Sequence, residues 1–408
     1  MLYRLEIENF SSIRDPQVLD LTIAPNVPDP DCRFAPVFPG SELRAPKVVA
    51  LFGANASGKT TVLRALEFLF TLVRDSAQRT VPGFPCERFN DDASRSRPIR
   101  MAVELGGAMN LSHDVLRRME AGEDVEYGVY RYELVLEVVD GLPQRILTEA
   151  LRQKPKGQGK WQRVFERSED GQVKDSKTFP LSGFHHLLNT LRPNVSVISS
   201  FALFQHPAAS LFVEEARKAF FLVGNANLVQ DKSVIDFLGA SPDLLPLLNK
   251  ELNRIDVGVE GMRFEPTPNG PQPMFKHSGL ELEMPWALES HGTRSFIRMF
   301  PALAITLRRG GLCVIDEFDL AIHPLVLPEI TRWFYDCLNK NPLDAQLWFT
   351  CHSASLLDDL NKEEIVLCEK DRDGRTNVYS LMDVKVRRDD NHYRKYLSGV
   401  YGGVPKLG

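Results

Sequence analysis

The feature that most constrains the fold is the segment Gly53–Thr60, which reads Gly-Ala-Asn-Ala-Ser-Gly-Lys-Thr. It fits the phosphate-binding pattern G-x-x-x-x-G-K-[ST] at every fixed position. An apolar run at 48–52 precedes it and an apolar-periodic segment at 61–70 follows it, which predicts a strand, a loop and a helix. Because this is the context in which the pattern cradles a phosphate, the segment predicts a nucleotide-binding α/β fold.

The residue types of this loop have different expected roles. Gly53 and Gly58 let the backbone turn so that successive N–H groups face a phosphate. Lys59 is expected to reach the β- and γ-phosphates, and the Thr60 hydroxyl to ligate Mg²⁺. The expected nucleotide-binding residues of the loop are Gly53, Asn55, Ala56, Ser57, Gly58, Lys59, Thr60 and Thr61.

Composition places the chain among ordinary globular proteins. It has 408 residues, of which 43% are apolar and 25% charged, so two or three lobes can share a large core. The net charge of −5 gives no global attraction for nucleic acid. The cysteines form no C-x-x-C pair, the N-terminus is not of signal-peptide type, and no apolar run reaches membrane-spanning length. We expect a cytoplasmic protein with no membrane segment.

Hydrophobic patterns divide the chain into three parts. Strand–helix alternation at 1–97 and 280–408 predicts one α/β domain made from two distant segments. Between them, 98–279 is expected to be an inserted lobe, β-rich over 98–180 and helical over 184–256. Finer expectations are a long loop at 24–46, a helix over 209–221, and apolar strands at 312–315, 346–350, 365–368 and 376–381.

An acidic pair follows one of these strands. Asp316 comes directly after the apolar run 312–315, and Glu317 follows it. A phosphate-binding loop needs a Mg²⁺-binding acid at the end of a nearby buried strand, and Asp316 supplies it. Glu317 is placed to orient or deprotonate the attacking water.

Two further segments extend the pattern. The run Glu289–Arg294 offers Ser290 and Gly292 at a helix start, where they could meet an anion or simply cap the helix. His352 ends a strand expected to lie beside the Asp316 strand. It could contact a γ-phosphate or be a satisfied core imidazole.

The order of these motifs resembles the ATP-binding cassette class of ATPases, in the branch that holds the SMC, RecF and OLD-like proteins. The resemblance implies a P-loop head with a mixed sheet and helices, built from the N- and C-terminal segments. In this branch two heads enclose ATP between them. By resemblance, Ser290, Gly292 and Thr293 are the signature that reaches a partner's ATP. Glu317 is the catalytic carboxylate, His352 the switch histidine and Asp319 part of the cross-dimer loop. Thr293 stands where a second glycine is usual.

Both ends of the chain extend the resemblance. Residues 7–13 look like the first strand of such heads. Residues 396–405 are similar to the tail of AAA-type ATPases from bacterial abortive-infection systems. This implies a homo-oligomer that works with a separately encoded effector, such as a TOPRIM- or HNH-type nuclease. Because few residues follow His352 in this sequence, we expect no nuclease domain within it.

We therefore expect an ATPase that dimerises around ATP and Mg²⁺ and acts as sensor and scaffold in anti-phage defence. The main alternative is a RecF-type DNA-repair ATPase that needs no toxic effector. A basic stretch could contact DNA or form a solvated hairpin, and it comprises Lys154, Lys156, Lys160, Trp161, Arg163 and Arg167. A free-standing nucleotide hydrolase is a third possibility, which the signature and the cross-dimer loop disfavour.

Overall fold

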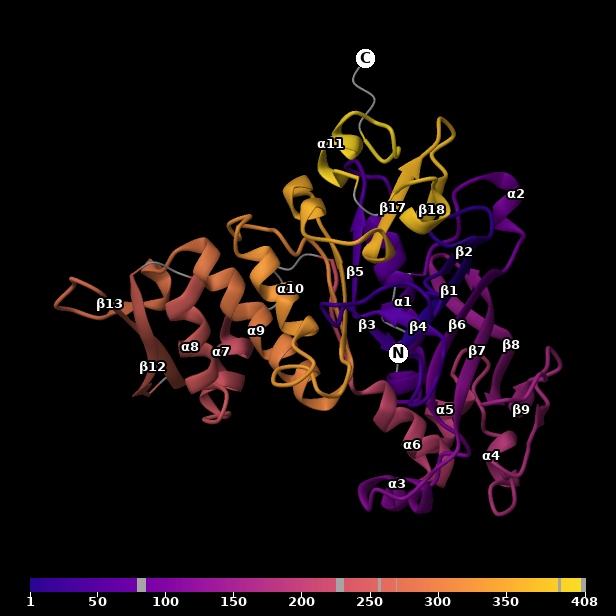
Figure 1. Ribbon diagram of the computed structural model, residues 1–408. Helices are drawn as coiled ribbons and strands as arrows, with labels where there is room; N and C mark the ends of the chain where they lie inside the picture. Colours follow the sequence, from indigo (N-terminus) through magenta and orange to yellow (C-terminus); the bar gives the residue numbers. More distant parts are fainter. Residues whose placement is uncertain (79–85, 225–230, 256–257, 269, 388–389, 405–408) are drawn as a thin grey trace.

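A computed structural model gives the architecture of residues 1–78, 86–224, 231–255, 258–268, 270–387 and 390–404. Two large sheets, of seven and six strands, form its body, and a three-stranded sheet forms a separate projection (Figure 1). Among the described residues, no helix has the length and apolar character needed to cross a bilayer.

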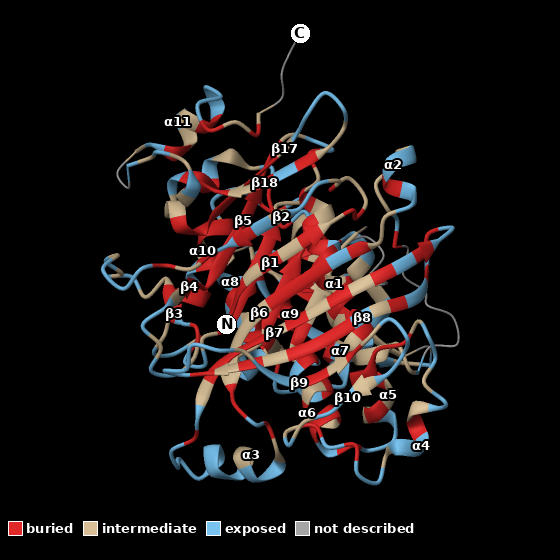
Figure 2. Ribbon diagram, turned by 90° about the vertical axis from the view of Figure 1, so that its right-hand side faces the viewer, coloured by how far each residue is buried: buried red, intermediate tan, exposed pale blue. Residues whose placement is uncertain are grey.

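The seven-stranded sheet contains the long antiparallel strands. In spatial order its strands are β10 (Val173–Lys174), β9 (Gln162–Arg167), β8 (Leu142–Pro155), β7 (Tyr127–Val139), β6 (Ile99–Ala108), β1 (Leu2–Glu8) and β2 (Gln17–Asp20). Buried and more exposed residues alternate along β1 and β7, as Figure 2 shows for the sheet seen from outside. One face therefore packs on the core and the other carries charged side chains.

The six-stranded sheet positions the phosphate-binding loop. Its order is β11 (Ala219–Leu222), β15 (Leu312–Ile315), β16 (Gln346–Thr350), β5 (Val48–Phe52), β17 (Ile365–Lys370) and β18 (Thr376–Ser380). Neighbours are parallel from β11 to β17, and β18 is antiparallel. Every residue of β5, β15 and β16 is buried, which explains their unbroken apolar runs.

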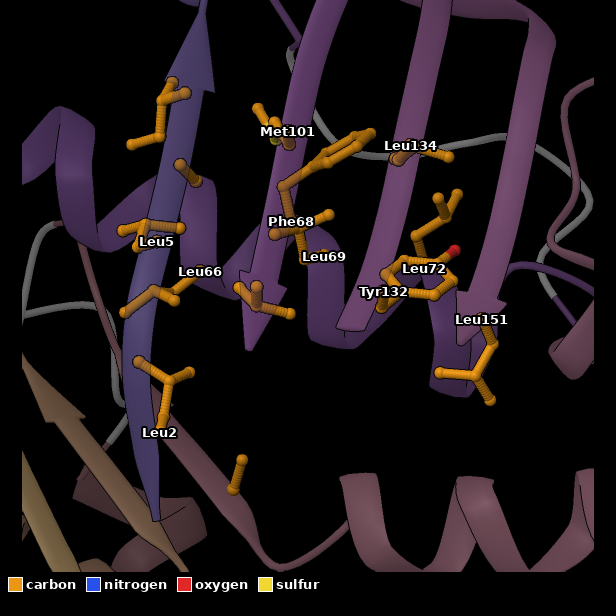
Figure 3. Packing of buried hydrophobic residues seen from close by; sticks show 14 of the residues in the cluster. Leu2, Leu5, Leu66, Phe68, Leu69, Leu72, Met101, Tyr132, Leu134 and Leu151 are labelled. Carbon is orange, nitrogen blue, oxygen red and sulfur yellow. The ribbon is translucent and has the colours of Figure 1, made fainter. Parts of the chain in front are cut away.

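Helix α1 (Lys59–Asp75) lies between the two large sheets. Its apolar face includes Leu66 and Leu72, and Figure 3 shows Leu66 beside Leu5 of β1 and Leu72 beside Tyr132 of β7. Val49 and Leu51 of β5 belong to the same buried cluster. A displacement of α1 would therefore disturb the packing of both sheets.

The opposite face of the six-stranded sheet is covered by α9 (His291–Arg309) and α10 (Leu327–Tyr335). Beyond these helices lies the projection, which Figure 1 shows on the left in orange-red. It consists of α7 (Asp231–Gly239), α8 (Leu245–Ile255), β12 (Val259–Thr267), β13 (Gly270–His277) and β14 (Met284–Pro285).

Short elements complete the fold. The α-helices among them are α2 (Asp92–Arg95), α3 (His113–Glu120), α4 (His185–Leu188), α5 (Val197–Leu203), α6 (Pro207–Ala216) and α11 (His392–Leu397). The remaining pieces are β3 (Phe34–Pro36), β4 (Arg44–Pro46), η2 (Trp286–Leu288), η3 (Ala354–Asp358), η4 (Lys362–Glu364) and η5 (Leu381–Asp383).

The expected α/β class with a mixed sheet is confirmed, and two local expectations are wrong. The loop at 24–46 contains the antiparallel pair β3 and β4. The helix expected over 209–221 ends at Ala216, because residues 219–222 instead form β11 and hydrogen-bond to β15. Tertiary pairing overrides the helical pattern there.

The division into a head and an inserted lobe stays a prediction. The hydrogen bonding adds that β6–β10, from the expected lobe, share one sheet with β1 and β2. Likewise β11 belongs to the six-stranded sheet. Residues 225–230, 256–257 and 269 of the expected lobe lie outside the described residues, as does Pro405 of the tail.

Candidate nucleotide-binding site

The phosphate-binding loop joins the end of β5 to the first turn of α1. Gly58 is the N-cap of α1 with φ of 103°, and Ala56 has φ of 61°. Both lie in the left-handed region, which curls the loop around its own N–H groups. Asn55 and Ala56 are exposed, whereas Ser57 and Lys59 are buried. The loop therefore presents its tip to solvent and keeps its lysine covered.

The interior of the loop fits a phosphate group. Lys59 Nζ donates to the carbonyls of Gly53 at 2.9 Å and Ala54 at 3.1 Å. Burial lowers the pKa of Lys59, against the opposing effect of the nearby Asp316 carboxylate. Among the described residues, the buried Ser57 hydroxyl has no hydrogen-bond partner. An orphaned hydroxyl and an ammonium group inside a turn of N–H groups are the donors that a phosphate accepts from.

The back of the loop is held by residues from both ends of the chain. The Thr376 hydroxyl donates to the Ser57 carbonyl at 2.9 Å and also lies 2.9 Å from the Ser12 hydroxyl. The Ser12 hydroxyl is also 3.0 Å from that of Thr61. Thr61 was expected among the nucleotide-binding residues, and its hydroxyl lies in this rear network.

Thr60 and Asp316 meet as expected for a pair of Mg²⁺ ligands. The Thr60 hydroxyl donates to Asp316 Oδ1 at 3.1 Å. Asp316 is only 4% exposed and follows β15, which is separated from β5 by β16. A hydroxyl and a carboxylate beside a phosphate cradle are the hard oxygen ligands that Mg²⁺ prefers. The residues present therefore fit Mg-ATP.

Glu317 has a backbone conformation that is uncommon for its residue type. Its φ is 52°, in the left-handed region. Its N–H donates to the Thr350 hydroxyl at 2.7 Å, and that hydroxyl donates to Asp316 Oδ1 at 2.6 Å. Sequence reasoning missed Thr350. The available signal was a threonine at a strand end two residues before His352.

Asp319 contacts the His352 segment of its own chain. Its Oδ2 accepts the N–H groups of His352 at 2.9 Å and Ser353 at 2.7 Å. The expected adjacency of the Asp316 and His352 strands is confirmed by the parallel pairing of β15 and β16. His352 is exposed, so it is not a core imidazole. A role of Asp319 or His352 toward a second copy stays a prediction.

The expected signature begins helix α9. Ser290 is the N-cap, and its Oγ accepts the N–H of Thr293 at 3.0 Å and lies 2.7 Å from the Thr293 hydroxyl. A Cβ on Gly292 would stand 2.6 Å from the carbonyl oxygen of Ala321. The signature therefore packs on the loop after β15. Within this chain Ser290 acts as a cap, and it is exposed toward solvent.

A buried carboxylate ties this cap to the projection. Glu289 Oε1 accepts the N–H of Ser290 at 2.7 Å, and its Oε2 is 2.9 Å from His277 Nε2 in β13. Glu289 is 5% exposed. The geometry of the signature is thus linked to β13, a connection that the sequence did not indicate.

The C-terminal segment packs on the start of the loop. The Tyr396 hydroxyl donates to the Gly403 carbonyl at 3.2 Å, and its ring lies 6.2 Å from that of Phe52. Gly403 has φ of 70°, and a Cβ there would stand 3.7 Å from the Cα of Gly53. The segment 396–403 therefore contributes to the shape of the site.

The basic stretch is only partly available for DNA. Arg167 is buried and donates to the carbonyl of Val195 at 2.9 Å. Lys154 lies over the Trp161 ring at 4.9 Å. Arg163 bonds the Asp175 carbonyl, which leaves Lys156 and Lys160 as the most open positions. Arg167 is thus a structural residue, contrary to its place in the expected patch.

Residues 48–358 match a family described as "AAA domain, putative AbiEii toxin, Type IV TA system". The chain belongs to this family. The matched region of the AAA domain runs from β5 into η3 and so contains the loop, Asp316 and His352. Among solved structures, the chain is similar to one titled "Crystal structure of the SmcHead bound to the C-winged helix domain of ScpA". That similarity has 14% identity and a TM-score of 0.45, and covers 94% of this chain and 99% of the other. No curated protein matches the sequence.

The family confirms the expected class at the level of an AAA-type ATPase domain, for which nucleotide binding is implied. The SMC, RecF or OLD-like branch stays a prediction. Within the described residues, no group of three or more His, Cys, Asp or Glu side chains could hold a metal ion by itself. The expectation that the chain contains no nuclease also stays a prediction.

Proposed function

We propose that this AAA domain binds and hydrolyses ATP with Mg²⁺, and that two copies enclose the nucleotide. The observation that carries the proposal is the hydrogen bond from Thr60 to Asp316 beside the loop, with Glu317 adjoining. Residues of two separate elements, α1 and the loop after β15, converge there, which supports a site for nucleotide hydrolysis.

Each residue has a defined part in the proposed reaction. The loop N–H groups and Lys59 bind the phosphates, and Thr60 and Asp316 hold Mg²⁺, which offsets charge on the phosphate oxygens. Glu317 orients the water and takes its proton at the side-chain carboxylate. Ser290, Gly292 and Thr293 of a second copy complete the site. Ser290 and His352 are exposed, which supports a part for them in contacts between copies.

Two substitutions test the reaction. Lys59→Ala is expected to abolish ATP binding. Glu317→Gln is expected to keep binding and slow hydrolysis about a hundredfold or more, because it removes the general base. Exposed residues provide matched controls, Lys160→Ala and Glu120→Gln. Fluorescent-nucleotide titration, phosphate release and light scattering measure binding, turnover and dimerisation. Normal hydrolysis by Glu317→Gln contradicts the proposed mechanism.

We further propose that closure of two copies controls a separately encoded effector in bacterial anti-phage defence, with the AAA domain as sensor and scaffold. The family description, which names a putative toxin of a toxin–antitoxin system, supports a role in defence or growth control. Affinity purification from the native host, followed by mass spectrometry, is expected to recover a TOPRIM- or HNH-type nuclease. Growth arrest caused by this chain alone, without such a partner, would contradict the scaffold role.

The alternative is a RecF-type DNA-repair ATPase. The exposed Lys156 and Lys160 on the connection between β8 and β9 favour it. Strong ATP-dependent binding of DNA by the purified protein, lost in a Lys156→Glu, Lys160→Glu variant, would select this alternative.

A further inference from the structure

Thr350 occupies a central position behind the proposed catalytic residues. It is the last residue of β16, which lies between β15 and β5, and it is 1% exposed. Asp316 and Glu317 follow β15 on one side, and the phosphate-binding loop follows β5 on the other. Because all three strands are parallel, their carboxyl ends share one edge of the sheet.

The Thr350 hydroxyl bridges the two acidic residues by acting as both a hydrogen-bond donor and an acceptor. It donates its proton to Asp316 Oδ1 at 2.6 Å and accepts the Glu317 N–H at 2.7 Å. The Thr350 carbonyl also accepts the N–H of Phe318 at 3.0 Å. One residue therefore fixes three consecutive positions of the loop after β15.

This bridge coincides with a strained point of that loop, since Glu317, like Ala321, has a positive φ. Glu317 has φ of 52°, a conformation that costs a non-glycine residue about 1–2 kcal/mol. Such a conformation persists where surrounding contacts over-determine it. The hydrogen bond from the Glu317 N–H to the Thr350 hydroxyl is one such contact, and it sets the direction in which the Glu317 side chain leaves the backbone.

We propose that Thr350 is a positioning residue that holds the carboxylate of Asp316 for Mg²⁺ and the backbone of Glu317 for the attacking water. The inference rests on the proposed function and adds a residue to it. Thr350 is buried, and its hydroxyl contacts both acidic residues. It acts through the two acids, so its loss should affect the metal-dependent part of nucleotide binding and the rate of hydrolysis together.

A pair of conservative variants separates the hydroxyl from the fold. Thr350→Val keeps shape and volume but removes both hydrogen bonds, whereas Thr350→Ser keeps the hydroxyl. Thr331 provides the control, because it is also 1% exposed and its hydroxyl donates to the Pro328 carbonyl within α10. Thr331→Val therefore removes a buried hydroxyl that is unconnected to the two acids.

The measurement compares affinity for a fluorescent ATP analogue in Mg²⁺ and in EDTA, together with ATP turnover. Thr350→Val is expected to reduce the gain in affinity given by Mg²⁺ about tenfold and to lower kcat about tenfold or more, as loss of hydrogen bonds at charged groups predicts. Its affinity in EDTA should change less than about twofold, because the loop itself is intact. Thr350→Ser should retain most of both quantities.

Two results would overturn the inference. One is an equal effect of Thr350→Val and Thr331→Val on the Mg²⁺-dependent gain, which would reduce Thr350 to a packing residue. The other is a Thr350→Ser variant as impaired as Thr350→Val although it folds. Failure of the proposed function is recognised separately, because the wild-type protein would then show no ATP binding that Lys59→Ala removes and no turnover that Glu317→Gln slows.

Discussion

Replacing Gly58 by alanine should destabilise the protein even when no nucleotide is present. A Cβ at this position would stand 2.2 Å from Thr376 Oγ1 and 2.5 Å from Thr376 Cγ2. Thr376 is 1% exposed, and its hydroxyl is engaged with Ser57 and Ser12, so the side chain has little freedom to move away. Gly58 is thus needed to avoid a clash with Thr376 of β18, in addition to its expected role in shaping the loop for a phosphate.

The magnitude follows from two contributions. Overpacking a buried contact costs about 1–3 kcal/mol, and a φ of 103° adds about 1 kcal/mol for a residue with a Cβ. The sum is about 3 kcal/mol. With an unfolding entropy of about 2 cal/mol/K per residue, a chain of 408 residues loses roughly 1 °C in Tm for each kcal/mol. A fall of about 3–4 °C in Tm is therefore expected.

Thermal and urea denaturation in EDTA, without ATP, measure this effect. Gly171→Ala is the control, because Gly171 has φ of 83° but nothing within 4 Å of the added Cβ, so it reports backbone strain alone. In a Thr376→Ala background the loss caused by Gly58→Ala should shrink by about 1–2 kcal/mol. Wild-type stability of Gly58→Ala, or an equal loss in both backgrounds, would refute the reasoning.

Three further predictions concern single contacts. Glu289→Gln should leave ATP binding intact and lower kcat about fivefold, because it weakens the hydrogen bonds that connect His277 to Ser290. An unchanged kcat would show that this connection does not affect turnover. Gly403→Ala should weaken the affinity for ATP measured by fluorescent titration, because the added Cβ would stand 3.3 Å from the Tyr396 ring beside the loop. Unaltered affinity would show that the segment 396–403 does not shape the site. Burial raises the pKa of Glu364 from 4.5 to about 7, so the folded protein holds this proton more tightly than the unfolded chain does. The resulting contribution to the free energy of unfolding is fully present below pH 4.5 and is lost as the pH rises through 7. Urea denaturation across that range should show a flatter pH dependence for Glu364→Gln.

The sequence alone indicated much of the site because its elements are buried and regular. The strand before the loop, the strand before Asp316 and the strand before His352 are unbroken apolar runs, and all three are confirmed. Parallel strands place their carboxyl ends at one edge, so the convergence of Thr60 and Asp316 followed from motif order.

The contacts that the sequence did not indicate are those that depend on which strands lie side by side. Thr350 and Thr376 act through hydroxyls that contact loops next to other strands, and a single threonine at a strand end carries no signal of this. The same holds for β11, where pairing with β15 overrides a helical pattern. The link from His277 to Glu289 required knowing that β13 reaches the start of α9.

The rear of the phosphate-binding loop is closed by a hydrogen bond between Ser12 and Thr376, which are 364 residues apart in the chain. During synthesis, a ribosome releases Ser12 and the loop long before Thr376 emerges. The nascent chain therefore carries a complete motif that lacks this rear support until Thr376 has been released. Chains interrupted before β18 would lack this contact, so the loop gains its full support only in chains that include this strand.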